Sequence, residues 1–277
     1  MFDALSYEFM RNALAAGILA SIACGMIGAL VAANRLTFLA GGVAHAAYGG
    51  VGLAMFTALP VVPVTGAFTV CAGLVMGAAT RRRSERSDIV VGVLWASGMA
   101  VGVILLDLTP GYKADLMSYL FGSILTVPSS DLLVMAILDA FLAATVMTFY
   151  NALAAVSFDR EFAEVRGLPV FFLHYLLPVM IALSVVMIIR VTGLILVIAL
   201  LTAPAYMAGR RARSLGGMMV LCALYNAFFC LAGLCFSYYL DLTSGACIIA
   251  VAAICFFLSL AYGTVRNRLA AAAGKGA

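Results

Sequence analysis

The sequence predicts an all-α, polytopic membrane protein, and three observations support that fold class. Apolar residues make up 65% of the 277-residue chain and charged residues only 10%, whereas a soluble domain carries about 25% charged residues. The apolar residues form long unbroken runs, not the alternating pattern of a transmembrane β-barrel. Most of the basic residues lie between those runs. Together these features exclude a soluble enzyme, a disordered chain and a nucleic-acid-binding domain.

Cysteine usage and the N-terminus agree with this class. The seven cysteines lie inside apolar runs, and none is spaced as Cys-x-x-Cys. We therefore expect buried thiols that behave as small apolar side chains, not a disulfide framework or a thiolate metal site. The first ten residues carry Asp3 and Glu8 but no basic residue, so they do not form a signal peptide and the first apolar run stays in the protein.

The hydrophobic pattern predicts about nine transmembrane helices, with eight as the alternative. A helix of about 20 residues crosses a hydrocarbon core of about 30 Å. Segments 63–80 and 193–209 are near the lower limit of length, and 118–127 is short enough to be a re-entrant or interfacial half-helix. The nine predicted spans are 12–33, 36–59, 63–80, 89–107, 131–150, 170–189, 193–209, 218–237 and 243–262.

The distribution of basic residues predicts the orientation. If the N-terminus is outside, most arginines and lysines fall on the cytoplasmic side, as the positive-inside rule requires. The opposite orientation would place them outside. We therefore expect an N-out, C-in topology, a single transmembrane domain over residues 1–277 and a cytoplasmic tail over 263–277. The outer face then holds more acidic than basic residues, which attracts cations mildly.

The cytoplasmic loop 157–168 between the fifth and sixth spans is predicted to form a short helix. Ser157 can cap its first turn, and Asp159 suits the positive end of the helix dipole. Gly167 can take the left-handed conformation that ends a helix, and Pro169 follows it. Helical spacing places three apolar side chains in one stripe, and these are Phe158, Phe162 and Val165.

Two interpretations of this loop remain open. It is either an interfacial helix that lies on the bilayer or a docking helix that enters a groove on a cytoplasmic partner. Helices that bind membrane surfaces are usually rich in basic residues. The acidic Asp159 and Glu161 therefore favour the docking helix.

The second span carries the histidine nearest to the bilayer centre, His45, about ten residues from the start of the span. Gly41 and Gly49 lie one turn before and after it, while Gly42 and Gly50 belong to a second ladder of small residues that allows close helix packing. His45 is either a neutral histidine hydrogen-bonded between helices or a metal ligand on a transport pathway. Ionisable groups at this depth are usually functional, which favours the second interpretation.

Two acidic residues are further candidates for the pathway. Asp139 lies inside the fifth span, where a carboxylate is costly, so it serves either a structural hydrogen bond or transport. Asp241 lies at the outer start of the last span and either caps that helix or offers an oxygen ligand near the outer mouth.

Motifs for catalysis and for ATP binding are missing from the sequence. It contains no HExxH and no GxSxG, and only two histidines are present. It also contains no GxxxxGK[ST], so a transport process driven by ATP would need a separate ATPase chain. We therefore expect a transport subunit and not an enzyme.

Five stretches carry a resemblance to a known family. They run in order from a glycine-rich histidine motif to a turn before the last span: 40–46, 119–125, 157–169, 191–204 and 240–245. Each motif is weak alone, but their order and spacing over residues 10–262 are similar to those of the membrane permease subunits of ABC importers for zinc, manganese and iron.

The resemblance implies a homodimeric permease in a bacterial-type cytoplasmic (inner) membrane. Its partners would be a cytoplasmic ATP-binding-cassette ATPase and an external metal-binding protein. It implies that 157–168 is the helix that contacts the ATPase, and that His45 and Asp241 lie on the metal route. The divalent metal ion is then the transported substrate, and no cofactor is bound permanently.

One departure from the family pattern affects the metal route. Many members carry an aspartate four residues before the histidine, where this chain has Gly41. Either another acid, such as Asp139 or Asp241, supplies the oxygen ligand, or the ion passes with weaker coordination.

Other functions remain as alternatives. A permease for a metal chelate of the siderophore or cobalamin type would use the same mechanism with a wider path. An ion-coupled secondary transporter would need no ATPase. The sequence does not choose among zinc, manganese and iron, because imidazole and carboxylate ligands suit all three.

Overall fold

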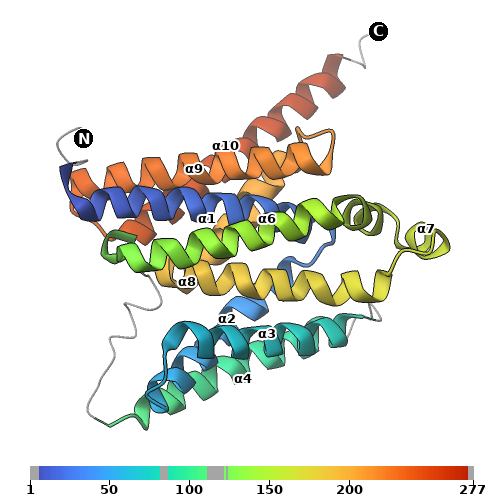
Figure 1. The fold of residues 1–277 in the computed structure, drawn as a ribbon. Coiled ribbons are helices and arrows are strands. Elements are labelled where there is room, and N and C mark those ends of the chain that lie inside the picture. Colours follow the sequence, from blue (N-terminus) through green and yellow to red (C-terminus); the bar gives the residue numbers. More distant parts are fainter. Residues whose placement is uncertain (1–5, 82–86, 111–121, 123, 274–277) are drawn as a thin grey trace.

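The computed structural model describes residues 6–81, 87–110, 122 and 124–273 (Figure 1). Within this part of the chain, eight helices are long and apolar enough to cross a membrane, which confirms the predicted fold class. These are α1 (Glu8–Ala33), α2 (Thr37–Phe56), α3 (Val61–Thr80), α4 (Ser87–Asp107), α6 (Ser129–Phe158), α8 (Val170–Gly209), α9 (Leu215–Leu240) and α10 (Ser244–Ala273). In α8 the spanning part is its first limb, Val170–Ile189.

The seventh predicted span, 193–209, is a shorter helix, so the described residues contain eight full spans, the alternative that the sequence analysis allowed, instead of nine. Helix α8 is interrupted at Gly193, whose φ of 76° and ψ of 170° are not helical. Glycine takes such a conformation without a Cβ clash. The apolar helix that follows, Leu196–Gly209, is only about 21 Å long at ~1.5 Å per residue, less than the ~30 Å of a hydrocarbon core.

The chain reverses direction at Gly193. At the start of the first limb, the Nε2 atom of His174 lies 2.8 Å from the carbonyl oxygen of Gly77, near the end of α3. Further along, Met187 lies beside Val62 at the opposite end of α3. The second limb, Leu196–Gly209, then returns toward the start of α2.

The helices fall into two groups that α8 joins (Figure 1). Helices α2, α3 and α4 pack on one another, α1 packs against α6 and α9, and α10 packs on α9, while α8 contacts both groups. Glycines set the closest approaches of α1. A Cβ at Gly25 would lie 2.6 Å from the Cβ of Ala223 on α9, and a Cβ at Gly28 would lie 2.7 Å from the carbonyl oxygen of Leu201 on the second limb of α8. Small residues such as these glycines therefore allow the helices to pack closely.

One end of the bundle gathers the ends of several helices and many arginines. The Nδ2 atom of Asn34, at the end of α1, donates to the Oγ of Ser157 on α6 at 2.8 Å. The backbone N–H of Gly216 on α9 donates to the Oη of Tyr150 on α6 at 2.9 Å. Exposed arginines at the ends of these helices are Arg81, Arg166, Arg210, Arg211 and Arg213. The positive-inside rule assigns this end to the cytoplasm, and the N-out orientation and the homodimer stay predictions.

Two predicted segments lie partly outside the described residues. Of segment 118–127, the structure describes 122 and 124–127, which include the 3-10 turn η2 (Ile124–Thr126) with Ile124 buried. The predicted tail, 263–277, continues as part of α10 as far as Ala273. Helical structure therefore extends beyond the last apolar residues of that span.

Candidate functional site

Helix α2 is held closely by its two neighbours at glycines. A Cβ at Gly42 would lie 2.7 Å from a methyl group of Val91, and one at Gly49 would lie 2.8 Å from the carbonyl oxygen of Gly98, both on α4. A Cβ at Gly50 would lie 2.8 Å from the Cα of Thr65 on α3. Real Cβ atoms do not approach other atoms so closely, so a side chain at Gly49 or Gly50 would require a backbone shift, and one at Gly42 would require the Val91 side chain to move.

Two further glycines complete the contact surface of α2. Gly52, which the sequence analysis did not single out, is the tightest, because its Cβ would lie 2.5 Å from the carbonyl oxygen of Gly102. At Gly41 the nearest atom would be the Cδ1 of Ile198 at an ordinary 3.7 Å. Gly41 is therefore not a close-packing position, and a Cβ atom fits there without a clash.

His45 lies near the middle of α2, and its imidazole stacks on the indole of Trp95 from α4. The ring centroids are 4.3 Å apart and the planes differ by 11°. The Nδ1 atom of His45 is buried and has no hydrogen-bond partner among the described residues. The structure thus gives no support to a histidine hydrogen-bonded between helices through Nδ1.

The sequence analysis did not single out Trp95, the aromatic neighbour of His45. It is the one tryptophan of the chain, and it lies inside a span, although tryptophan prefers the membrane–water interface. That unusual depth was the available signal. Its Nε1–H donates to the sulfur of Met99 at 3.2 Å, and Phe38 of α2 approaches its ring with centroids 6.0 Å apart.

Asp139 lies on α6 in the other helix group, with 6% of its surface exposed. Both carboxylate oxygens are buried without a hydrogen-bond partner in the described chain. Asp139 is close enough to Cys24 of α1 for an electrostatic interaction. The described residues thus offer no structural hydrogen bond to Asp139, which was one of its two predicted roles, and the carboxyl group is costly to bury.

Asp241 has a different local role from the cap of the last span considered above. It ends α9 in the left-handed conformation, with φ of 54° and ψ of 43°, and its backbone N–H donates to the carbonyl oxygen of Ser237. The Oγ of Ser237 in turn donates to the carbonyl oxygen of Leu242 at 2.6 Å. Asp241 is exposed in the turn between α9 and α10.

The structure does not bring these three candidates into one site. His45 lies in the α2–α3–α4 group, Asp139 faces α1 from α6, and Asp241 lies in a turn beyond α9. Among the described residues, no three His, Cys, Asp or Glu side chains are placed to hold a metal ion. A metal ion at His45 would therefore be held by few protein ligands, which suits passage more than storage.

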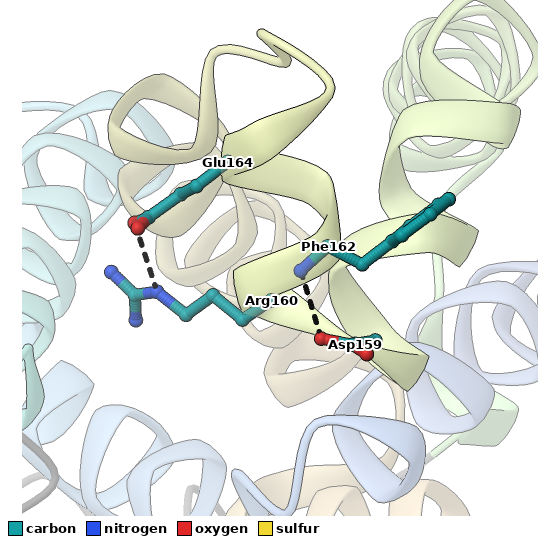
Figure 2. Close-up of polar contacts among 4 residues, drawn as sticks. All are labelled: Asp159, Arg160, Phe162 and Glu164. Carbon is teal, nitrogen blue, oxygen red and sulfur yellow. Dashed lines mark hydrogen bonds and ion pairs between the residues drawn. The ribbon is translucent and has the colours of Figure 1, made fainter.

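The predicted cytoplasmic helix is α7 (Arg160–Val165), and its cap differs from the predicted one (Figure 2). Asp159 caps α7, because its Oδ1 accepts a hydrogen bond from the backbone N–H of Phe162 at 2.9 Å. The Ser157 cap was wrong, since α6 continues through Phe158. Within α7, the Nε atom of Arg160 lies 3.8 Å from Glu164 (Figure 2).

The rest of α7 is fixed at its end and on one side. Gly167 follows it with φ of 73°, in the left-handed region, as the sequence predicts. The backbone N–H of Leu168 donates to the carbonyl oxygen of Ala163 at 3.1 Å. Ala163 is fully buried and anchors the helix to the bundle.

Phe162 and Val165 are exposed on α7, whereas Phe158, the first residue of the predicted stripe, ends α6 and is separated from α7 by Asp159, whose φ of −147° and ψ of 102° are not helical. Phe158 is 77% exposed, Phe162 51% and Val165 89%. The guanidinium of Arg166 lies 5.0 Å from the centroid of the Phe162 ring. Exposed apolar side chains on a helix with mixed charges fit a groove on a protein partner.

A cavity of about 350 Å³ lies behind α7, at the arginine-rich end of the bundle. It is bounded by the ends or starts of α1, α2, α3, α4, α6 and α8, and Arg160 is the α7 residue that lines it. Phe38, the neighbour of Trp95, also lines it. The cavity therefore separates α7 from the helix that carries His45.

The fold, the contact of His45 with Trp95 and the exposed side chains of α7 define a multi-pass membrane protein of the permease class. Residues 6–263 match the ABC 3 transport family, and the chain belongs to that family. It is 48% identical to an uncharacterised membrane protein of Synechocystis, over 95% of this chain and 93% of the relative. It is 31% identical to the manganese transport system membrane protein MntC of Listeria monocytogenes, over 96% of this chain and 94% of that protein.

A solved structure agrees with the family assignment. A chain of PsaBC from Streptococcus pneumoniae, determined in complex with Fab, superimposes with a TM-score of 0.84 at 30% sequence identity and covers 93% of each chain.

Proposed function

We propose that this chain is the membrane permease subunit of an ATP-driven importer for a divalent transition-metal ion, with Mn²⁺ as the first candidate. The observation that carries the proposal is α7, a short helix capped by Asp159 on which Phe162 and Val165 are exposed, together with the exposed Phe158 at the end of α6. A membrane channel or an intramembrane enzyme does not need such a surface, whereas a subunit that receives work from an ATPase does.

The assembly we propose has three further components. A second copy of this chain and two cytoplasmic ATP-binding-cassette subunits complete the transporter, and an external metal-binding protein delivers the ion. The N-terminus lies outside, and α7 lies at the cytoplasmic face of a bacterial-type inner membrane. The relative named as a manganese transport protein supports the choice of Mn²⁺.

In this proposal His45 contacts the ion during passage. Asp241 and Asp139 are the other candidates for the route. The residue at Gly41 contributes no oxygen ligand, so coordination in a single chain is weak. Weak coordination is compatible with transport, because a permease must release the ion that it binds.

The test is the metal content of chelator-starved cells, measured by elemental mass spectrometry. A strain that lacks this chain is compared with the same strain carrying the wild type, His45→Ala, Phe162→Asp or the matched control Phe162→Leu, each quantified in the membrane. We expect the deletion to lose Mn²⁺ and the wild type and Phe162→Leu to restore it, whereas Phe162→Asp and His45→Ala do not. Unchanged content of Mn²⁺, Zn²⁺ and iron in the deletion strain would refute the proposal and favour a chelate substrate.

A further inference from the structure

The indole of Trp95 covers one face of the His45 imidazole, in the middle of the α2–α4 contact. Aromatic pairs in proteins usually have centroids about 4.5–7 Å apart, and this pair is at 4.3 Å with nearly parallel planes. The stack brings together His45, which is proposed to contact the metal ion, and Trp95, which has no other role in the proposed function.

Glycine contacts on both sides of the stack fix its geometry. One turn toward the start of both helices, Gly42 leaves room for Val91, and one turn beyond the stack Gly49 lies against the backbone of Gly98. A Cβ at Gly98 would itself lie 2.8 Å from the Cα of Ala46. The two backbones therefore cannot slide or separate without breaking these contacts, and the rings are held face to face.

Trp95 makes two further contacts. Its Nε1–H donates to Met99, one turn further along α4. The Phe38 ring packs against it at a tilt of 55°. These contacts fix the orientation of the indole, so the imidazole of His45 is the ring whose orientation depends on the stack.

A histidine that binds a metal usually donates its other ring N–H to a carboxylate or a carbonyl oxygen, which fixes the orientation of the ring. His45 has no such partner at Nδ1 in the part of the chain that the structure describes. His45 as a whole is only half-buried, so Nε2 is the nitrogen open to an ion. The stack is thus the contact available to orient the imidazole.

We propose that Trp95 is a positioning residue for metal transfer at His45, where ring stacking takes the place of the usual hydrogen-bond partner. Trp95 holds the imidazole with Nε2 presented to the passing ion and does not itself bind the ion. This inference deepens the proposed function and rests on it.

The first test uses the fluorescence of Trp95, which needs no label because the chain has a single tryptophan. The purified full-length protein in detergent micelles is titrated with Mn²⁺, a paramagnetic quencher, and with Mg²⁺ as the control cation. We expect Mn²⁺ to quench the emission in a saturable manner in the wild type and in His174→Ala, the other histidine variant. The saturable quenching should disappear in His45→Ala. Equal quenching in His45→Ala and wild type, or none in the wild type, would overturn the proposal.

The second test separates positioning from structural support through Mn²⁺ uptake into cells. We expect Trp95→Leu to raise the half-saturating Mn²⁺ concentration about 2- to 10-fold, the range expected for loss of one aromatic pair, with its maximal rate retained. Trp95→Phe should restore most of the affinity. A half-saturating concentration unchanged in Trp95→Leu, or one lost equally in Trp95→Phe, would overturn the positioning role.

The two tests also distinguish failure of this inference from failure of the proposed function. If the wild type does not transport Mn²⁺ but shows saturable quenching that depends on His45, the transport proposal fails and the shared site of His45 and Trp95 stands. If the wild type transports Mn²⁺ and neither test responds to Trp95 or His45, the positioning role fails and the transport proposal stands.

Discussion

Removal of the α7 cap by Asp159→Ala is expected to weaken the contact with the ATPase about fivefold. The Oδ1 of Asp159 accepts the hydrogen bond of the Phe162 backbone N–H at 2.9 Å, and loss of such an N-cap costs about 1 kcal/mol. A helix as short as Arg160–Val165 is not stable alone, so its order depends on this cap and on the contacts of Ala163. A change of about 1 kcal/mol in the order of α7 lowers the population of the competent helix roughly fivefold relative to its disordered form.

The matched control is Asp159→Asn, because asparagine caps a helix as well as aspartate does but carries no charge. The assay measures binding of the purified ATPase to the permease in nanodiscs, together with transport-coupled ATP hydrolysis in proteoliposomes. We expect Asp159→Ala to bind about fivefold more weakly and Asp159→Asn to bind like the wild type. If the asparagine variant is as weak as the alanine variant, the carboxylate contacts the ATPase directly and the capping argument is refuted. If alanine has no effect, the order of α7 does not limit coupling.

Three further predictions concern packing, the end of α7 and the metal route. Gly52→Ala should destabilise the solubilised protein by about 1–3 kcal/mol in thermal unfolding, because the added Cβ would lie 2.5 Å from the Gly102 carbonyl oxygen. The control Gly41→Ala should leave the stability unchanged. Equal stability of the two variants would contradict this account of the packing. Gly167→Ala should speed proteolysis next to α7, since the left-handed φ of 73° at this position costs an alanine about 1 kcal/mol. Gly167→Asn should show a smaller effect. Identical cleavage rates for the alanine variant and the wild type would count against a left-handed turn. Gly41→Asp should tighten Mn²⁺ binding in calorimetry and slow uptake, because it adds a carboxylate one turn before His45; unchanged affinity would place the ion elsewhere.

The spans could be predicted from sequence because hydropathy reports directly on burial in lipid, and eight of the nine predicted segments became full spans. The exception, 193–209, is apolar enough for a span, and nothing in its composition reveals the non-helical backbone of Gly193. The cap of α7 was assigned to Ser157 because the end of α6 was placed too early. In the structure Ser157 is still helical, and its Oγ donates to the carbonyl oxygen of Leu153 at 2.7 Å.

The candidate site was harder to predict because it depends on which helix faces which. His45 is identifiable from its depth and its glycines, but Trp95 lies on a different span, and the glycine contacts between α2 and α4 decide that the two rings meet. The same information was needed to see that Asp139 and Asp241 lie apart from His45. The sequence around each residue indicates its chemistry, whereas the packing of helices that are far apart in the sequence decides which residues come into contact.

The reversal at Gly193 affects how this part of the chain is integrated during synthesis. The helix Leu196–Gly209 is too short to be retained across the bilayer by its own partition into lipid. It is retained by other helices, through the approach of Leu201 to α1 and through the Nδ2 atom of Asn226 on α9, which donates to the carbonyl oxygen of Leu200 at 3.1 Å. Since α9 leaves the ribosome after this helix, a chain truncated before α9 would keep the contact of Leu201 with α1 but lack the hydrogen bond from Asn226. The final arrangement of this segment is therefore completed after translation has passed it, when α9 docks.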